Sequence, residues 1–244
     1  MLEEYMGLDM QILLENDSLS RRVIHRLQAG QNIDAQLIAE YRFLEQYYDC
    51  WSAFFAFMGY KLQRSFQGGE IFYYLQENSS KVKVVTLRRG PTFLGLFLAS
   101  HFLSSGIEGK DEVLARDILS RLENSFEFSQ LVKVFNPQQK KFMKNRQQSN
   151  RQMQQLKGWV LTSLRELHRL RFVELYPSVN ADFERLRIMR LPGLIRFLEP
   201  AKRSLDLEYD GQKDLDTAIK SIWTSIDWDE NNEEYHAEND SEDS

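Results

Sequence analysis

The residues of this sequence best suited to chemistry are the basic side chains between residues 131 and 171. This segment holds ten Lys or Arg residues and a single acid, Glu166, so its formal charge is +9. Basic side chains in such a run can bind the phosphates of a nucleic acid, because binding releases condensed counterions. Gln and Asn separate the basic residues, so the i,i+4 counter-charges of a solvated helix face are missing. The run is therefore either a phosphate-binding surface or a solvated helix face.

The candidate DNA-binding residues come from this segment and from a later strand. In that strand, Arg185 and Arg187 alternate with Leu186 and Ile188, which predicts one basic face and one buried face. The candidates are Lys140, Lys141, Lys144, Arg146, Arg151, Lys157, Arg165, Arg169, Arg185 and Arg187.

Other reactive side chains form no catalytic or metal-binding pattern. The sequence has no phosphate-binding glycine loop, no Gly-x-Ser-x-Gly elbow and no His-Glu-x-x-His motif. Its four histidines are far apart, and the single cysteine, Cys50, excludes a disulfide framework and a Cys-based zinc site. We therefore expect no enzymatic activity, no cofactor and no metal.

Charge is strongly segregated along the 244 residues. The net charge is -5, but the last 18 residues hold nine acids and no Lys or Arg, which leaves +4 for the rest of the chain. Such a block of like charge predicts a disordered tail, which either solubilises the protein or competes with DNA for the basic segment. No run reaches the ~18 apolar residues of a membrane span, and no basic, apolar leader opens the chain, so a cytoplasmic protein is expected.

The elements that position these residues begin with an aromatic helix. Asn32 or Asp34 could cap its start, and it would run as one long helix to about Gly59. Apolar residues recur in two adjacent stripes with helical spacing. The first stripe is Leu37, Tyr41, Leu44, Tyr48, Trp51, Phe55 and Met58; the second is Phe43, Tyr47, Cys50, Phe54 and Phe57.

Two apolar stripes on one helix indicate a second buried surface beyond the core of a small domain. That surface could face the other domain, a second copy or another protein, since interface cores are rich in aromatic residues. Which stripe is core stays open; the candidate partner-binding residues are Phe43, Tyr47, Phe54 and Phe57.

The order of elements predicts tandem winged-helix domains, a mainly α fold with small β-hairpin wings. A hairpin with a glycine turn follows the aromatic helix at about 60–75, and 81–87 could add a strand. The second unit would hold helices at 90–104, 111–122 and 126–134 and a basic loop at 136–150. A helix to about 170 follows, with Met153, Leu156, Val160, Leu164 and Leu167 on one side, and then a hairpin at 171–190 and a short helix at 191–199. The expected domains are 1–80 and 81–200, followed by an extension at 201–226 and the acidic tail at 227–244.

Three stretches make the sequence resemble the MukE and MksE family, together with the equivalent subunit of Wadjet-type complexes. They are Ile71-Phe72-Tyr73-Tyr74-Leu75 at the end of the first hairpin, the apolar helix after Leu87-Arg88-Arg89, and Ser163-Leu164-Arg165-Glu166-Leu167-His168-Arg169-Leu170 running into Phe172-Val173. The chain departs from the pattern at Arg171, where MukE-like chains have Gly, and at Glu166 and His168, which replace arginines.

The resemblance implies a non-catalytic subunit of a bacterial MukBEF-like condensin. Such a subunit dimerises, binds the kleisin (MukF or MksF-like) and reaches the SMC ATPase (MukB or MksB-like) through it. It would help to clamp double-stranded DNA at the ATPase heads without sequence preference, for chromosome organisation or plasmid defence, in the nucleoid. The alternative is a stand-alone winged-helix transcription regulator, which would prefer one DNA site strongly.

Overall fold

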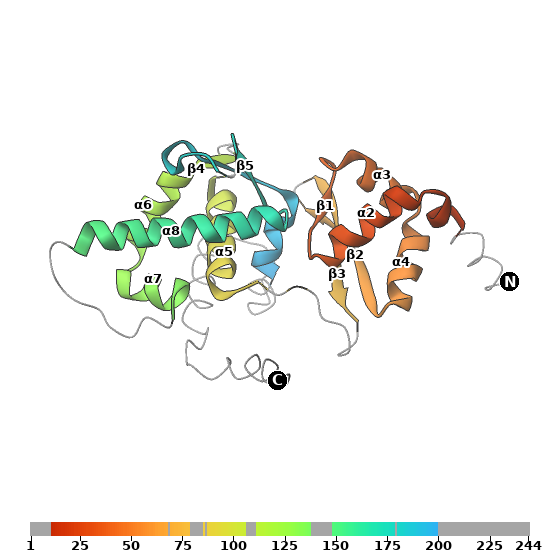
Figure 1. The fold of residues 1–244 in the computed structure, drawn as a ribbon, viewed down its shortest axis with the longest axis horizontal. Coiled ribbons are helices and arrows are strands. Elements are labelled where there is room, and N and C mark those ends of the chain that lie inside the picture. The colour runs from red at the N-terminus through yellow and green to blue at the C-terminus, as the bar shows by residue number, and fades with distance from the viewer. Residues whose placement is uncertain are drawn as a thin grey trace, which may run out of the picture. The chain divides into compact units, whose positions relative to one another are not determined.

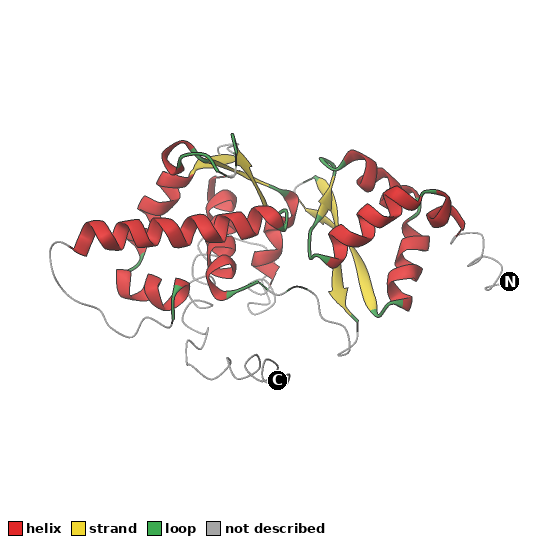
Figure 2. Cartoon of the chain, viewed as in Figure 1, coloured by secondary structure: helices red, strands yellow, loops and turns green. Residues whose placement is uncertain are grey.

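The structure is a computed structural model that describes residues 11–67, 69–78, 85, 87–105, 111–137, 148–178 and 180–199. These residues are mainly helical and include two small antiparallel sheets, as Figure 2 shows. The predicted fold class, mainly α with small β-hairpin wings, is confirmed. The described elements belong to one compact unit that ends at Glu199. The domain boundaries stay predictions, and the extension at 201–226 and the acidic tail lie outside the described residues.

The N-terminal lobe, described residues 11–67 and 69–78, joins helices to a three-stranded sheet with the order β1-β3-β2 (Figure 1). Its elements are α2 (Asp17–Gln28), β1 (Ile33–Asp34), α3 (Ile38–Gln46), α4 (Tyr48–Phe57), β2 (Tyr60–Gln67) and β3 (Glu70–Glu77). The predicted hairpin is confirmed, because β2 pairs antiparallel with β3 from Tyr60↔Glu77 to Gln67↔Glu70. Gly69 in its turn has φ 86°, a conformation that favours glycine.

The prediction of one long aromatic helix is wrong in two places. Asn32 and Asp34 do not cap it, because Ile33–Asp34 pairs with β3 as a strand and the helix α3 begins only at Ile38. The helix also breaks at Tyr47, whose φ of -120° and ψ of 39° are not helical. Backbone hydrogen bonds from Tyr47 to Phe43 and from Trp51 to Tyr47 continue on both sides, so the break is a local change of direction.

The C-terminal lobe, described residues 87–199, has a second three-stranded sheet with the order β4-β6-β5. Its elements are α5 (Arg89–Ser105), β4 (Glu112–Leu114), α6 (Ala115–Ser125), α7 (Phe128–Phe135), α8 (Gln148–Arg169), β5 (Val173–Tyr176), η2 (Phe183–Arg185), β6 (Arg187–Arg190) and η3 (Pro192–Leu198). Most of the basic loop predicted at 137–150, and most of the possible strand at 81–87, lie outside the described residues.

The second lobe corrects two details of the prediction. Residues 112–114 are a strand rather than the first turn of a helix, because they pair antiparallel with β6 and place Val113 opposite Ile188. Residues 183–185 form a 3-10 turn instead of a strand, and the side chain of Asp182 accepts a hydrogen bond from the Glu184 amide there. The short helix predicted at 191–199 is confirmed as η3.

Each lobe has an apolar core. In the N-terminal lobe, Trp51 and Phe55 of α4 are fully buried and pack with Leu27 of α2 and Tyr73 of β3. The carboxylate of Glu40 is also buried there, within 3.2 Å of Arg22 and 3.4 Å of Arg26, so its charge is neutralised. In the C-terminal lobe, α8 and α5 pack together. The helix α8 lies along the lobe beside the small sheet (Figure 1).

Candidate nucleic-acid and partner surfaces

The long helix α8 has a buried apolar side and an exposed basic side. Leu156, Val160, Leu164 and Leu167 are fully buried, as their spacing predicts, whereas Met153, predicted on the same side, is exposed. The exposed side, called the α8 face here, consists of residues spaced four, three, four, three and four positions apart. They are Arg151, Gln155, Gly158, Thr162, Arg165 and Arg169.

The arginines of the α8 face are available for a ligand. Within the described residues, Arg151, Arg165 and Arg169 have no ion pair, and the face contains no acid. Arg151 and Arg169 are separated by 18 residue steps, about 27 Å at 1.5 Å per step, which matches several phosphates along one nucleic-acid strand. A Cβ added to Gly158 in the middle of the face would meet no atom within 4 Å, so a phosphate backbone can approach the helix closely there.

Three other predicted DNA-binding residues are placed differently. Lys157 donates to Glu184 at 3.0 Å and lies 5.0 Å from the Phe183 ring centroid, so its charge is already compensated within the lobe. Arg187 donates to Glu112 at 3.2 Å. Arg185 is exposed on the wing and has no ion pair among the described residues. The alternation in this strand holds, because Leu186 and Ile188 between and beside the arginines are buried.

The remaining four candidates, Lys140, Lys141, Lys144 and Arg146, lie outside the described residues. The structure thus brings three of the ten predicted residues onto one face. Sequence reasoning missed Gln155, Gly158 and Thr162, which complete that face. These polar positions recur at the same helical spacing as the apolar ones, so this periodicity is the signal that indicates them in the sequence.

The candidate partner-binding aromatic residues are divided between core and surface. Phe43 is buried, with its ring centroid 5.5 Å from that of Trp51. Tyr47 and Phe54 are half-buried against the same core, whereas Phe57 is 87% exposed. Both stripes therefore enter one core, since the break at Tyr47 lets residues of α3 and α4 converge on Trp51.

One side of α4 exposes small and apolar groups around Phe57. Ala53 and Ala56 are exposed beside it, and Asp49 lies one turn before Ala53. The helix contains no Lys or Arg. This surface, called the α4 face here, suits an apolar protein segment much better than a phosphate chain.

The described residues contain no group of three or more His, Cys, Asp or Glu side chains that could hold a metal ion. In the same part of the chain, every helix is too short or too polar to cross a membrane. Comparison with known proteins gives one family: a model described as "Condensin complex protein MksE" matches residues 18–201. No curated protein matches the chain.

Proposed function

The chain belongs to the MksE family of condensin complex proteins, and from that premise we propose that it is a non-catalytic subunit that binds DNA through the α8 face and a kleisin through the α4 face. In this role it dimerises, contacts the SMC ATPase through the kleisin and helps to clamp DNA at the ATPase heads in the nucleoid. The same task serves chromosome organisation or plasmid defence.

The observation that carries the proposal is the unpaired arginine face of α8. Arg165 and Arg169, four residues apart, repel each other, and no described carboxylate neutralises these two or Arg151. Phosphate binding removes that repulsion and releases counterions. Contacts of this kind position DNA without reading its bases, as a clamp requires.

The two lobes differ in the charge of the helix that precedes the wing. In each lobe, a helix precedes a wing: α4 precedes β2 and β3, and α8 precedes β5. The helix α8 carries four Lys or Arg residues and one acid, whereas α4 carries a single charge, that of Asp49. Nucleic acid therefore suits the C-terminal lobe, and an apolar protein partner suits the N-terminal lobe.

The test of the assembly is a pull-down of the tagged protein from its native host at moderate salt, with the ratios of co-purifying proteins measured. We expect a kleisin and a large coiled-coil ATPase in fixed proportion. Recovery of the protein alone, or as a homodimer with DNA only, would contradict the proposal and favour a transcription regulator.

Two exposed phenylalanines make a matched pair for the partner surface. Phe57 lies on the α4 face, and Phe66, 68% exposed, lies on β2 of the same lobe. Replacing Phe57 by Ser should weaken kleisin binding about 10- to 100-fold, the value of burying one aromatic side chain. Phe66→Ser should leave binding unchanged. Equal losses in both variants would mean that the α4 face is not the kleisin site.

A helix followed by a wing, as in α8 and β5, is also the arrangement of the recognition helix of a transcription regulator. Preference for one DNA sequence distinguishes such a regulator from a clamp subunit. Binding of the purified protein to a set of random duplexes decides between the two. A clamp subunit should bind all of them with similar affinity, whereas a regulator should prefer one site by about 10³-fold or more.

A further inference from the structure

The outer face of the first wing is covered. Side chains alternate along β3, so Tyr73 and Leu75 point into the N-terminal core while Phe72 and Tyr74 point to the opposite face. Phe72 and Tyr74 are nevertheless buried, with stacked rings whose centroids are 5.8 Å apart. The helix η3 of the C-terminal lobe packs against β3, and its Arg196 guanidinium lies 3.7 Å from the Tyr74 ring centroid.

The helix η3 is wedged between elements of both lobes. Toward the C-terminal lobe, the ring centroids of Phe197 and Phe172 are 4.8 Å apart, and a Cβ added to Gly95 of α5 would clash with the Phe197 ring. Toward the N-terminal lobe, a Cβ added to Gly193 would be 2.5 Å from the Asn32 side chain. Glycines at both positions allow this close approach.

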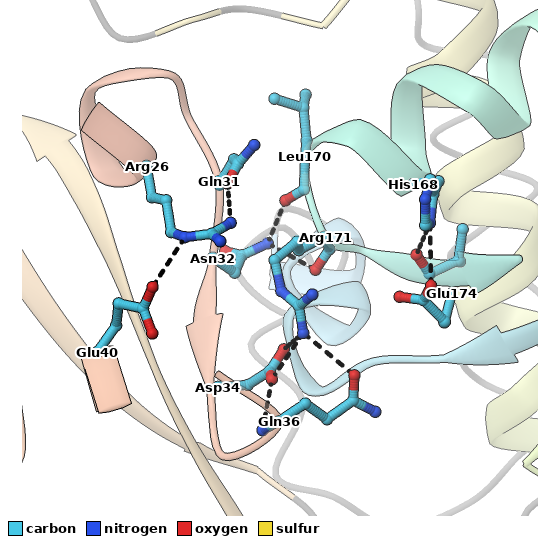
Figure 3. A network of polar contacts seen from close by, with 11 residues as sticks. Arg26, Gln31, Asn32, Asp34, Gln36, Glu40, His168, Leu170, Arg171 and Glu174 are labelled. Carbon is cyan, nitrogen blue, oxygen red and sulfur yellow. Dashed lines mark hydrogen bonds and ion pairs between the residues drawn. The ribbon is translucent and has the colours of Figure 1, made fainter. Parts of the chain in front are cut away.

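Asn32, at the start of β1, has all of its polar side-chain atoms satisfied by the C-terminal lobe. It is fully buried, and its amide nitrogen donates to the carbonyl oxygens of Leu170 and Arg171, each at 3.2 Å. Its amide oxygen accepts from Arg196 Nη1 at 2.8 Å. Its backbone N–H also donates to Leu170. Figure 3 shows the side chain of Asn32 directed at the corner that follows α8.

At the same corner, Arg171 forms an ion pair with Asp34 of β1. Arg171 Nη2 donates to the two Asp34 carboxylate oxygens at 2.9 and 3.2 Å and to Gln36 Oε1 at 3.1 Å (Figure 3). The side chain of Asp34 is 1% exposed and that of Arg171 is 14% exposed, so solvent screens the pair little.

Arg171 has two energetically unfavourable features, which its ion pair with Asp34 offsets. Its φ of 58° is a left-handed conformation that non-glycine residues adopt rarely. Its Nε is buried and finds no hydrogen-bond partner in the described part of the protein. A glycine would suit the backbone better, but it could not neutralise the buried Asp34. Removing either partner of such a pair is costly, because the other charge is left buried and unpaired.

We propose that the two lobes form one rigid body whose relative orientation is fixed by the Arg171–Asp34 ion pair and the Arg196–Asn32 hydrogen bond. Because Arg171 lies two residues beyond the end of α8 at Arg169, the pair sets the direction of α8 relative to the N-terminal lobe. The subunit is then a rigid bracket, and a partner bound to the N-terminal lobe holds the α8 face in a fixed position. The rigidity does not depend on whether that face binds DNA.

The test measures the distance between spin labels in the two lobes by pulsed electron paramagnetic resonance. The labels are attached at Arg42→Cys in α3 and Ser120→Cys in α6, both exposed positions, with Cys50, the only other cysteine, replaced by Ala. We expect one narrow distance distribution for this labelled protein, with or without DNA.

Two variants each remove one partner of the junction ion pair, and a third variant serves as the control. Asp34→Asn keeps the shape of the side chain and removes its charge; Arg171→Asn removes the guanidinium and tolerates the left-handed backbone. Both should broaden the distribution. Glu112→Gln removes the same charge as Asp34→Asn but from an exposed ion pair within one lobe, and it should leave the distribution narrow.

A second pair of labels, at Arg42 and Lys61, lies within the N-terminal lobe. Its distance distribution should stay narrow in every variant, which shows that the lobe is folded. If Asp34→Asn broadens the distribution for this second pair, the test of the proposal rests on Arg171→Asn, because that substitution leaves the N-terminal lobe unchanged. A narrow interlobe distribution in Arg171→Asn, or a broad one in the unsubstituted labelled protein, would overturn the proposal. Because the readout needs no DNA, it is independent of the proposed DNA binding.

Discussion

Replacing Arg151, Arg165 and Arg169 together by Gln should reduce the salt dependence of DNA binding by an amount that follows from their number. Each phosphate contact contributes about 0.9 to the slope of log affinity against log salt on duplex DNA. Three free arginines on the α8 face therefore account for about 2.7 of the slope. Between 50 and 200 mM salt, the unsubstituted protein should lose about 40-fold more affinity than the triple variant.

The assay is fluorescence anisotropy with two labelled duplexes of unrelated sequence, titrated at several salt concentrations. Both duplexes should show the same change, because phosphate contacts carry no sequence information. The free energy of unfolding should change by less than about 0.5 kcal/mol per substitution, since the three side chains are exposed and have no ion-pair partner among the described residues.

Lys157 provides the matched control on the same helix. Lys157→Gln removes one positive charge, but Glu184 at 3.0 Å already compensates that charge, so the slope should change much less than for one free arginine. An unchanged slope in the triple variant would refute the assignment of the α8 face. A loss in Lys157→Gln as large as one free contact would refute the role given to ion pairing.

Three further predictions concern stability. Trp51→Ala should lower the free energy of unfolding, measured in urea, by about 3–5 kcal/mol, because Trp51 is fully buried. Gly95→Ala should lower it by about 1–3 kcal/mol through the clash with Phe197, whereas Gly158→Ala on the open α8 face should raise it by about 0.4–1 kcal/mol. Burial, with a contribution from the Arg121 guanidinium, lowers the pKa of His101 from 6.5 to about 4. Its contribution to stability should therefore be present above pH 6.5 and be lost as the pH falls towards 4.

Each of these predictions has a contrary outcome. A loss below about 1 kcal/mol for Trp51→Ala would mean that the aromatic core of α4 is not closed. If Gly95→Ala and Gly158→Ala changed the free energy of unfolding in the same direction, the packing of η3 on α5 would be contradicted. A His101 titration followed by nuclear magnetic resonance with its midpoint near 6.5 would show that the imidazole is solvated.

The sequence predicted the elements whose pattern is local. The β2–β3 hairpin followed from apolar runs on either side of a glycine turn, and the apolar side of α8 from a repeat of three and four residues. The alternation of Leu186 and Ile188 with the basic residues of the second wing is also correct, because a strand with one buried face repeats every two residues.

Elements that depend on distant partners were not predictable in this way. The strands β1 and β4 have two and three residues, too few to show a period. Each exists because a strand far along the chain offers backbone hydrogen bonds: Ile33 pairs with Tyr73, and Val113 pairs with Ile188. The polar residues beside β1 therefore looked like helix caps in the sequence, although they hold the junction between the lobes.

The candidate site shows the same limit at the level of single charges. The sequence predicted Arg151, Arg165 and Arg169 as basic candidates of one segment, and the structure places them on one side of α8. Which basic residues are already paired was not visible, because Glu184 lies 27 residues from Lys157 and Glu112 lies 75 residues from Arg187. Formal charge in the sequence therefore overstates the charge that a ligand can meet, and only tertiary contacts separate free from compensated cations.

The two lobes contain similar elements but differ in what their wings and helices leave exposed. In the N-terminal lobe, both faces of β3 are buried, so its wing cannot use Phe72 or Tyr74 to contact DNA, and the helix before it has no basic residue. In the C-terminal lobe, one face of the wing exposes Arg185 and Arg187, and α8 exposes three more arginines. Covering the first wing with η3 thus has two consequences with a single cause. Under the proposed function it leaves DNA binding to the C-terminal lobe, and under the proposed junction it joins the two lobes into one body that would hold DNA at a fixed position relative to a protein partner.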